Sequence, residues 1–479
     1  ITNVRHNVIN QKLIIKAEQG TFMPILLNSV DRIEFTKHLY EVLNPSVPVD
    51  SIELLFGREK ELEDIEYSLH ARGRHCFIYG DRGIGKSSLA HTVATQLQSS
   101  EKRHLRAECH PNSTFVSVIN SLVSYANKQS PLHKIEKHSK SSAKLSGFSY
   151  EQGEKTLIAH SLSSTATVDE ALDLFRDIAT TYSENTIAVV DEFDAITDQK
   201  ELSKFGEFLK YLGDLDIDVT LIFTGIGKSL EDLLGGHLSS ARQLHQVNLE
   251  PLNWTGRYDI IDKAFSTFGV SIADDFRFKI AGLSDGFPHY VHLLCEKILI
   301  EMHKLGGEYQ EVTREIFLAG LDDAINSIGE HIKRDYVNAT EGRDEHFHHL
   351  LWAMADSADL IRSAEHIKFS YHEISKSMVA QSLTDDEFKK HFAKLRGERF
   401  GNIIVRGLGK RTGWFKFREN MVRGFIRMYA ERNDITLDFE RHYTANTASA
   451  KATHTYRAYR PLTSVESNVA KLRNDKVGA

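Results

Sequence analysis

The sequence predicts an α/β fold in which helices cover both faces of a parallel sheet. Short apolar runs typical of buried strands alternate with segments of helical periodicity. A glycine-rich phosphate-binding motif separates the first of these runs from a helix expected at Lys86–Leu97. Beyond residue 250 the pattern is helical, and it then changes to helices followed by a hairpin. The expected strands are His75–Tyr79, Leu105–Cys109, Ile187–Val190, Val219–Phe223 and Gln246–Leu249.

Length and composition limit the classes of protein that fit. The chain has 479 residues, of which 41% are apolar and 26% charged, so about two to four ordinary globular domains are expected. The net charge of −7 excludes a protein that coats nucleic acid along its whole length. Cys76, Cys109 and Cys295 lie far apart, which fits buried thiols in a reduced compartment. Because the chain has no long apolar run and no signal-peptide pattern, we expect a cytoplasmic protein without membrane contact.

The pattern changes at several points along the chain. Prolines mark an arm at the N-terminal end, and a stretch rich in Ser, Lys and His marks an exposed insertion. The last part is polar and is expected to be extended. The expected parts are an N-terminal arm (1–50), an αβα nucleotide-binding core (51–250) with an exposed insertion (129–164), a helical lid (251–340), a winged-helix domain (341–430) and a polar C-terminal tail (431–479).

The winged-helix prediction depends on the order of elements after the lid. Three helical stretches are expected, at 347–355, 371–379 and 384–396. Two strand-like runs, 402–406 and 413–417, follow them and are joined by a segment rich in glycine and basic residues. Helix, helix, helix and hairpin is the order of a winged helix.

The segment Gly80–Ser87 matches the P-loop pattern GxxxxGK[ST] in full. Its glycines let the backbone curl so that N–H groups point at the phosphates, and the helix that follows adds its positive end. We expect Lys86 to contact the β- and γ-phosphates and the Ser87 hydroxyl to bind Mg²⁺. The expected nucleotide-binding residues of the loop are Gly80, Asp81, Arg82, Gly83, Ile84, Gly85, Lys86, Ser87 and Ser88.

A second motif, Thr186–Glu192, is an apolar strand that ends in two acids. At this distance after a P-loop it is typical of a Walker B strand. Asp191 would hold Mg²⁺ through water, and Glu192 would act as the general base on the attacking water. Asp194 is expected to be an exposed loop acid.

Two further residues have more than one interpretation. Thr224 ends a predicted strand, where it is either a sensor of the γ-phosphate or an ordinary strand-end residue. Arg242 precedes the strand that leads out of the core. It either reaches the γ-phosphate of a neighbouring subunit, senses the bound nucleotide within its own subunit, or is a surface arginine.

These features together resemble the AAA+ ATPases over residues 51–335. The segment Leu54–Glu59 is similar to the family's stretch upstream of the P-loop, which implies that Gly57 and Arg58 line the adenine pocket. The resemblance implies ATP and Mg²⁺ as cofactors and a homo-oligomer completed by Arg242. With a winged helix after the lid, the chain is similar to origin-recognition-like initiators and to STAND and archaeal-type ATPases.

The lid departs from the initiator pattern. Where initiators carry a sensor arginine, this chain reads Gly286–His292 without one. The Gly-x-Pro there resembles the STAND signature, which implies that Pro288 packs against the nucleotide. Pro288 also fits as a simple helix-start residue. His289 is a substitute candidate for the missing arginine.

Basic residues gather in the expected winged helix. Residues 384–430 hold 12 Lys/Arg against 5 Asp/Glu. Such side chains on a recognition helix and a wing could contact DNA phosphates, with Trp414 at the base of the wing. The module could instead be an intramolecular lock or a protein contact. The candidate DNA-binding residues are Lys389, Lys390, Lys394, Arg406, Lys410 and Arg411.

The preferred hypothesis is an oligomeric AAA+ ATPase that hydrolyses ATP and uses nucleotide state as a switch. Its output would be binding of DNA or of an effector protein encoded nearby. Resemblance alone suggests initiator-like, mobile-element or antiviral-defence roles. The alternative is a STAND-like signalling scaffold with slow hydrolysis, an autoinhibitory winged helix and no DNA role.

Overall fold

The computed structural model describes most of the chain in two compact units. The first contains the described residues up to Arg334 together with Glu419–Asp434, and the second contains Asp335–Arg418 and those from Ile435 on. Much of the insertion expected at 129–164 and of the tail expected at 431–479 lies outside the described residues. The described residues are 25–45, 48, 51–98, 102–129, 162–164, 166–183, 185–227, 242–306, 309–376, 382–407 and 412–441.

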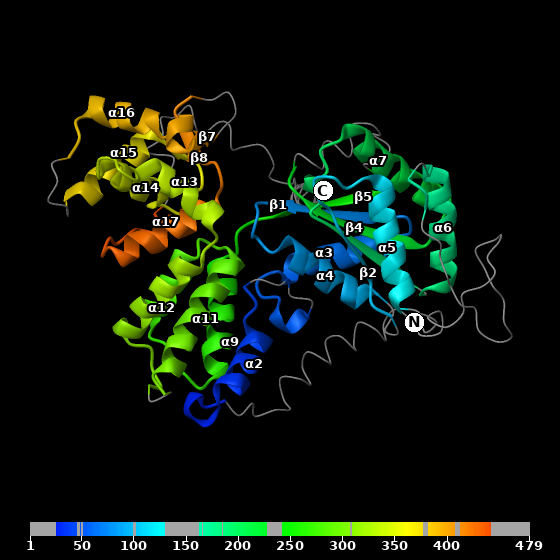
Figure 1. Ribbon diagram of the computed structural model, residues 1–479, viewed down its shortest axis with the longest axis horizontal. Helices are drawn as coiled ribbons and strands as arrows, with labels where there is room; N and C mark the ends of the chain where they lie inside the picture. Colours follow the sequence, from blue (N-terminus) through cyan, green and yellow to red (C-terminus); the bar gives the residue numbers. More distant parts are fainter. Residues whose placement is uncertain are drawn as a thin grey trace, which may run out of the picture. The chain divides into compact units, whose positions relative to one another are not determined.

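The core of the first unit is a five-stranded sheet in the order β2-β3-β4-β1-β5 (Figure 1). Each neighbouring pair is parallel, as the sequence predicts. The expected strands agree with the observed ones to within two residues at each end. The strands are β1 (His75–Gly80), β2 (Leu105–Glu108), β3 (Thr186–Asp191), β4 (Val219–Gly225) and β5 (Leu244–Leu249).

Helices cover both faces of this sheet (Figure 1). Side chains along a strand alternate between faces, so Cys76 and Ile78 of β1 enter one apolar cluster and Phe77 enters the other. All three cysteines are buried and free, as expected. On one face lie α3 (Glu59–Leu69) and α4 (Lys86–Leu97), and on the other α5 (Phe115–Gln129), α6 (Val168–Thr181) and α7 (Gln199–Asp214).

Short polar signals fix where several helices begin. The Thr167 side chain accepts a hydrogen bond from Glu170 N, and the Glu170 carboxylate accepts one from Thr167 N, which forms a capping box at the start of α6. Thr384 and Glu387 form the same arrangement at α16 (Asp385–Lys394). Both pairs show the S/T-x-x-E pattern in the sequence.

The lid is helical, as expected. The N-terminal segment adds η1 (Leu27–Ser29) and α2 (Arg32–Val42) to it, because the Phe35 ring lies 4.2 Å from the His303 ring and 5.4 Å from that of Phe268. A further turn, η2 (Ile52–Leu54), precedes α3, and η5 (Phe193–Ala195) follows β3. The helices of the expected lid are α9 (Trp254–Thr267), α10 (Asp274–Leu283), α11 (Pro288–Lys304), α12 (Arg314–Ser327) and α13 (Glu330–Thr340), of which α13 passes into the second unit after Arg334.

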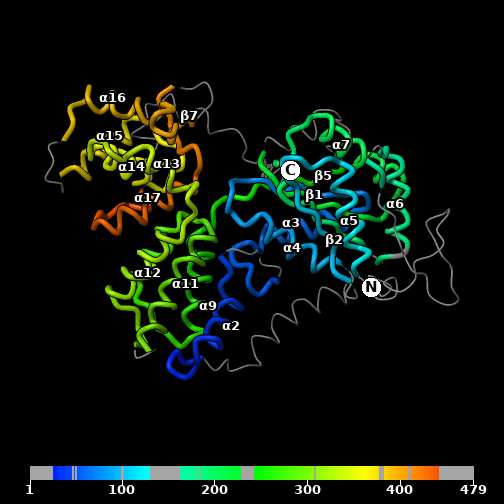
Figure 2. The backbone as a smooth tube through the Cα atoms, in the orientation of Figure 1, coloured from blue at the N-terminus to red at the C-terminus, as the bar shows by residue number. Residues whose placement is uncertain are grey.

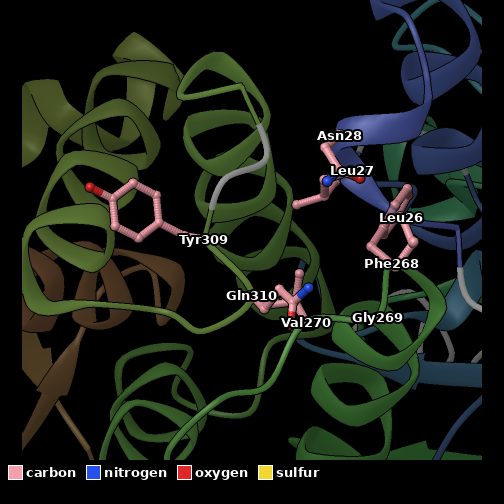
Figure 3. Close-up of a pocket in the computed structure, with 8 residues that line it drawn as sticks. All are labelled: Leu26, Leu27, Asn28, Phe268, Gly269, Val270, Tyr309 and Gln310. Atoms are coloured by element: carbon pink, nitrogen blue, oxygen red, sulfur yellow. The ribbon is translucent and has the colours of Figure 1, made fainter.

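A small pocket lies where the N-terminal segment meets the lid (Figure 3). Leu26 and Tyr309 at its edge are about half exposed. The pocket includes no residue of the P-loop. Its lining residues are Leu26, Leu27, Asn28, Phe268, Gly269, Val270, Tyr309 and Gln310.

The second unit combines helices with a three-stranded sheet in the order β6-β8-β7. Strand β6 is absent from the sequence prediction, because two residues are too few to show an alternating pattern. Helix α15 begins seven residues before the expected 371, and 377–379 lie outside the described residues. The elements are α14 (His346–Ala355), β6 (Arg362–Ser363), α15 (Ala364–Lys376), α16, η7 (Glu398–Phe400), β7 (Ile404–Arg406) and β8 (Trp414–Phe417).

Helix α17 (Met421–Arg432) belongs to the first unit, although the expected winged-helix segment runs to residue 430. Figure 2 shows it beside α12. Arg423 Nη2 lies 2.7 Å and Arg427 Nη1 3.0 Å from Asp285 Oδ1, and all three side chains are buried. This buried cluster ties α17 to the lid.

None of the helices in the described part of the chain is long and apolar enough to cross a membrane.

Candidate nucleotide site

The site lies at the carboxyl ends of three neighbouring strands. Because β4 lies between β1 and β3, the ends of these strands place Gly80, Thr224 and Asp191 side by side. Ligands of open parallel sheets bind at this edge. The P-loop, the two acids at the end of β3 and Thr224 near the end of β4 therefore lie at one edge of the sheet.

The P-loop has a shape that requires its glycines. A Cβ atom on Gly80 would collide with the Leu249 carbonyl oxygen, since β1 and β5 approach closely there. Gly83 has φ +75° and Gly85 has φ +96°, both in the left-handed region. Gly85 is the N-cap of α4, so backbone N–H groups at the positive end of that helix face the loop.

Lys86 is held over the loop by backbone oxygens. Its Nζ donates to Gly80 O at 3.2 Å and to Asp81 O at 2.8 Å. Burial lowers the pKa of the Lys86 amine, and the nearby charges of Asp194, Asp191 and Asp81 oppose this shift. Asp194 is exposed, as expected, yet its charge has the largest opposing effect. The amine is therefore positioned to exchange carbonyl partners for phosphate oxygens.

Asp191 connects the P-loop to the ends of β3 and β4. Its Oδ1 accepts a hydrogen bond from Ser87 Oγ at 2.9 Å, one from the Thr224 hydroxyl and one from Glu192 N at 3.0 Å. A hydroxyl and a carboxylate are the oxygen ligands that Mg²⁺ prefers. Ser87 and Asp191, both expected as metal ligands, are thus in direct contact and fit that ion.

Glu192 has a strained backbone that its neighbours stabilise. Its φ is +52°, a conformation that costs a residue other than glycine about 1 kcal/mol or more. Its N–H also donates to Thr224 Oγ1 at 3.1 Å. Thr224 is buried, while Glu192 is exposed. The Thr224 hydroxyl therefore links the Asp191 carboxylate to the Glu192 backbone N–H. This arrangement fits Thr224 both as a γ-phosphate sensor and as an ordinary strand-end residue. In either case its hydroxyl orients Asp191 and Glu192.

The sequence around this site is similar to a known family of domains. Residues 54–210 match the family model described as "AAA ATPase domain". This stretch is similar to that domain. The parallel sheet and the P-loop after β1 agree with it and confirm the expected α/β P-loop AAA+ core. No protein of curated function matches the chain in sequence.

Several solved structures show similarity to the chain. The Walker-type ATPase PABY2304 of Pyrococcus abyssi has a TM-score of 0.48 and 16% identity, over 80% of this chain and 99% of that one. The ORC2 protein of Aeropyrum pernix, in ADPNP–ADP complexes, has a TM-score of 0.44 and 12% identity, over 82% and 98%. The ORC1 protein of Aeropyrum pernix, in complex with DNA, has a TM-score of 0.41 and 16% identity, over 82% and 96%.

Upstream of the P-loop, two residues expected at an adenine pocket make internal contacts. The Arg58 guanidinium is buried and donates to Ile84 O at 3.2 Å and to Glu250 O at 2.6 Å. Burial lowers its pKa, and the Glu61 carboxylate opposes the shift. Gly57 has φ +66°, and a Cβ atom on it would lie 2.8 Å from the Cα of Gly256 in α9. Both residues hold the P-loop, β5 and the lid together.

The Gly-x-Pro segment of the lid also lies near the P-loop. Pro288 is the first residue of α11, and its Cγ lies 3.6 Å from where a Cβ atom on Gly85 would stand. It therefore satisfies the helix-start interpretation and faces the loop. His289 Nδ1 donates to Pro45 O at 2.6 Å, so this ring nitrogen is occupied by the N-terminal segment.

Helix α17 supplies two contacts that sequence reasoning missed. Asn420 Nδ2 donates to Asp81 Oδ2 at 2.6 Å. A Cβ atom on Gly83 would lie 2.6 Å from Met421 Sδ. These residues follow the P-loop by more than 330 positions, and no local motif marks them. The start of α17 and its N-cap residue, Asn420, thus lie directly on the P-loop.

The remaining expected site residues lie at the surface or close to it. Arg82 and Arg242 are exposed, and Ser88 is half-buried in the first turn of α4. Arg242 lies two residues before Leu244, the first residue of β5.

The candidate DNA-binding residues are only partly brought together. Lys389, Lys390 and Lys394 are exposed on α16, and Arg406 is exposed at the end of β7. Lys389 also lies 3.5 Å from Asp386, and Lys394 Nζ lies 5.8 Å from the Phe347 ring. Trp414, expected at the base of the wing, begins β8 and is half-buried. Lys410 and Arg411 lie outside the described residues.

The local excess of basic residues is smaller than the sequence suggests. Of the 12 Lys/Arg in 384–430, Arg423 and Arg427 are buried and face Asp285 in the lid. Their position in the sequence suggests that they belong to the DNA-binding module. In the structure, however, α17 packs against the lid.

Proposed function

We propose that this chain is an ATPase that binds ATP with Mg²⁺, hydrolyses it, and uses its nucleotide state as a switch. The observation that carries the proposal is the hydrogen bond from Ser87 to Asp191, which joins the P-loop to the Walker B strand. Binding of a phosphate chain needs the first motif, and hydrolysis needs the second. The two lie in one site with their functional groups in contact.

Each group has a separate task in this proposal. The P-loop N–H groups and Lys86 bind the phosphates, and Lys86 balances charge that develops on them during hydrolysis. Ser87 and Asp191 would hold Mg²⁺, which would neutralise phosphate charge. Glu192 accepts a proton from the attacking water. Thr224 keeps the Glu192 backbone in the conformation that presents its carboxylate.

Two variants test the catalytic assignment. Lys86→Ala is expected to lose nucleotide binding, measured by fluorescence titration with a labelled ADP. Glu192→Gln is expected to bind with near-normal affinity but to release phosphate at least about 100-fold more slowly, because a general base contributes on the order of 10²–10⁴ in rate. Glu63→Gln, at an exposed position on α3, is the matched control. Normal turnover in Glu192→Gln would show that another group is the base.

We propose that α17 passes the nucleotide state to the second unit. Residues 418–420 alone separate β8 from α17, and the chain returns to the second unit at Ile435. A phosphate bound in the loop would compete with the contacts of Asn420 and Met421 on Asp81 and Gly83. Hydrogen exchange in β7 and β8 is therefore expected to differ between ATP-bound and nucleotide-free protein. Asn420→Ala should reduce that difference, and an unchanged difference would contradict this route.

We propose a winged-helix module in the second unit and DNA as its first candidate ligand. The order helix, strand, helix, helix, hairpin supports the module, and exposed Lys389 and Lys390 on its third helix support the ligand. DNA should then stimulate ATP hydrolysis. Lys389→Glu with Lys390→Glu should abolish the stimulation, while Lys60→Glu with Lys200→Glu, which changes net charge equally at exposed sites of the first unit, should not.

Two observations favour the scaffold alternative. Arg423 and Arg427 pair with buried Asp285 and so are not available to DNA, and the start of α17 contacts the P-loop. In that case the second unit would bind an effector protein, and α17 would keep the protein inactive. Phosphate contacts are strongest at low salt. If DNA neither binds nor stimulates hydrolysis at about 50 mM salt, the DNA role should be dropped and the scaffold retained.

A further inference from the structure

A buried arginine lies between the P-loop and the start of the lid, and the proposed mechanism assigns it no task. Arg58 is the N-cap residue of α3 and is 5% exposed. Its carbonyl accepts from Leu62 N at 2.9 Å, which closes the first turn of that helix. A Cβ atom on Gly57, the residue before it, would stand 2.8 Å from the Cα of Gly256. The Arg58 side chain therefore starts from a rigid point in the first unit.

The guanidinium is held by main-chain oxygens from two separate segments. Its Nη2 donates to Glu250 O at 2.6 Å and to Ile84 O at 3.2 Å, while its Nη1 donates to the Glu61 carboxylate at 3.2 Å. Each Nη carries two hydrogens, so one nitrogen can serve both carbonyls. A buried charge is costly unless it is paired and hydrogen-bonded, so these contacts keep the side chain in its present geometry.

The Ile84 carbonyl fixes the direction of the next N–H group. The Ile84 side chain is 1% exposed and lies in the same apolar cluster as Ile65 of α3. In a trans peptide the C=O and the following N–H point in opposite directions. Because the Ile84 carbonyl points at Arg58, the Gly85 N–H points away from Arg58. Backbone N–H groups of a P-loop are the donors that contact phosphates.

We propose that Arg58 is a positioning residue of the P-loop, which holds the peptide between Ile84 and Gly85 in the orientation that presents the Gly85 N–H to the phosphates. This inference rests on the proposed function, because it assumes that the P-loop binds a phosphate chain. The family resemblance implies a different place for Arg58, beside the adenine ring. The two roles differ in the end of the nucleotide that they affect, since the peptide acts on the phosphates and an adenine contact acts on the base.

The test compares two nucleotides that share adenosine and differ in the β-phosphate. The affinities for ADP and for AMP are measured by calorimetric titration in excess EDTA, where neither metal nor turnover contributes, and their ratio is the phosphate gain. Arg58→Gln removes the charge and is too short to reach both carbonyls. Arg58→Lys keeps the charge but has one ammonium group in place of a planar fork, so it cannot reproduce both contacts.

We expect Arg58→Gln to lower the phosphate gain by about tenfold and Arg58→Lys by about threefold, with the affinity for AMP within about twofold of wild type. The matched control is Glu61→Gln, which changes the charge beside the same guanidinium by one unit and leaves both carbonyl contacts in place. It should keep the gain within about twofold. Because the gain is a ratio measured on the folded protein, a loss of stability does not by itself change it.

The outcomes separate this inference from the function on which it rests. If ADP and AMP lose affinity equally in the Arg58 variants, the arginine acts on the base, and the positioning role is overturned. A wild-type gain in Arg58→Lys overturns it as well, even if Arg58→Gln proves too unstable to measure, because charge alone would then explain any loss. If the wild-type protein binds ADP no better than AMP, the proposed phosphate site fails and takes this inference with it.

Discussion

At the scale of single residues, the site is organised around one oxygen atom. Asp191 Oδ1 receives donors from the P-loop, from β4 and from the peptide that follows it. The sequence predicted Ser87, Asp191 and Thr224 separately, because each ends a strand or begins a helix in a recognisable motif. That Ser87 and Thr224 both donate to Asp191 depends on β4 lying between β1 and β3, an order that no local pattern reveals.

Removing the Thr224 hydroxyl tests this arrangement. Thr224→Val keeps the shape but removes the donor to Asp191 and the acceptor for Glu192 N–H, so the strained Glu192 backbone should relax. We expect the turnover number to fall by about 100-fold, as for the loss of one oriented group, with ADP affinity within about threefold. Thr224→Ser should retain most activity. Wild-type turnover in Thr224→Val would reduce Thr224 to an ordinary strand-end residue.

At the scale of elements, α17 is where prediction from sequence was wrong. Its basic residues follow a predicted hairpin closely, and proximity in sequence favoured one basic module. In the structure a buried carboxylate, Asp285, attracts Arg423 and Arg427 to the lid instead. Long-range pairs of this kind leave no periodic signal, whereas the P-loop, β3 and the capping boxes are local and were predicted closely.

The buried cluster makes a quantitative prediction about stability. Arg423→Ala leaves Asp285 with one of its two arginine partners and should lower the free energy of unfolding of the first unit by about 3 kcal/mol. Asp285→Asn should cost a similar amount, because two guanidinium groups then lack their carboxylate. The double variant should cost less than the sum, since both changes remove one interaction.

Urea unfolding followed by fluorescence measures these differences, with Arg432→Ala as the control. Arg432 is on the same helix and pairs with Asp322 at 2.7 Å, but it is about 40% exposed, so the loss should be below about 1 kcal/mol. Equal losses for Arg423→Ala and Arg432→Ala would show that the buried cluster does not anchor α17.

At the scale of the whole molecule, local motifs predicted the nucleotide core and the lid, but not where the units divide. The core follows from strands and a P-loop that lie in sequence order, and the lid from an unbroken helical pattern. Residues 419–434, however, belong to the first unit, although they follow most of the second unit in the sequence. Folding of that segment depends on partners more than 100 residues away, such as Asp285 and Asp81.

Buried histidines predict how the first unit responds to acid. Burial lowers the pKa of His75 and of His292 to about 4, and that of His104 to about 3, against 6.5 in an exposed histidine. Between pH 6.5 and 4 the unfolded chain binds protons that the folded chain does not. Stability is therefore complete above about pH 6.5 and is lost as the pH falls toward 4.

Three such groups give a slope of about 4 kcal/mol per pH unit within that window. Urea unfolding at several pH values between 4.5 and 7.5 measures it. His75→Gln should be less stable at pH 7.5 and should show a slope smaller by about 1.4 kcal/mol per pH unit. A slope unchanged in that variant would mean that His75 is already neutral in the unfolded chain or charged in the folded one.

Oligomer formation gives the last prediction, because it decides whether Arg242 acts within one subunit or between two. Arg242 is exposed and lies outside the hydrogen-bonded cluster around Asp191, which fits a residue that completes a neighbour's site. Arg242→Ala should lower ATP turnover by about 10³-fold if the arginine stabilises charge on the γ-phosphate.

Glu192→Gln is expected to be inactive for a different reason, since it keeps Arg242 but lacks the base. Mixing the two inactive variants should restore activity, because an Arg242→Ala subunit has an intact Glu192 and receives the arginine from its Glu192→Gln neighbour. Measured phosphate release in the mixture should rise well above that of either variant alone and should depend on protein concentration. If the mixture stays as inactive as its parts while Arg242→Ala alone is impaired, the arginine acts within its own subunit. If Arg242→Ala alone turns over normally, it is a surface arginine, and an oligomer is not needed to complete the site.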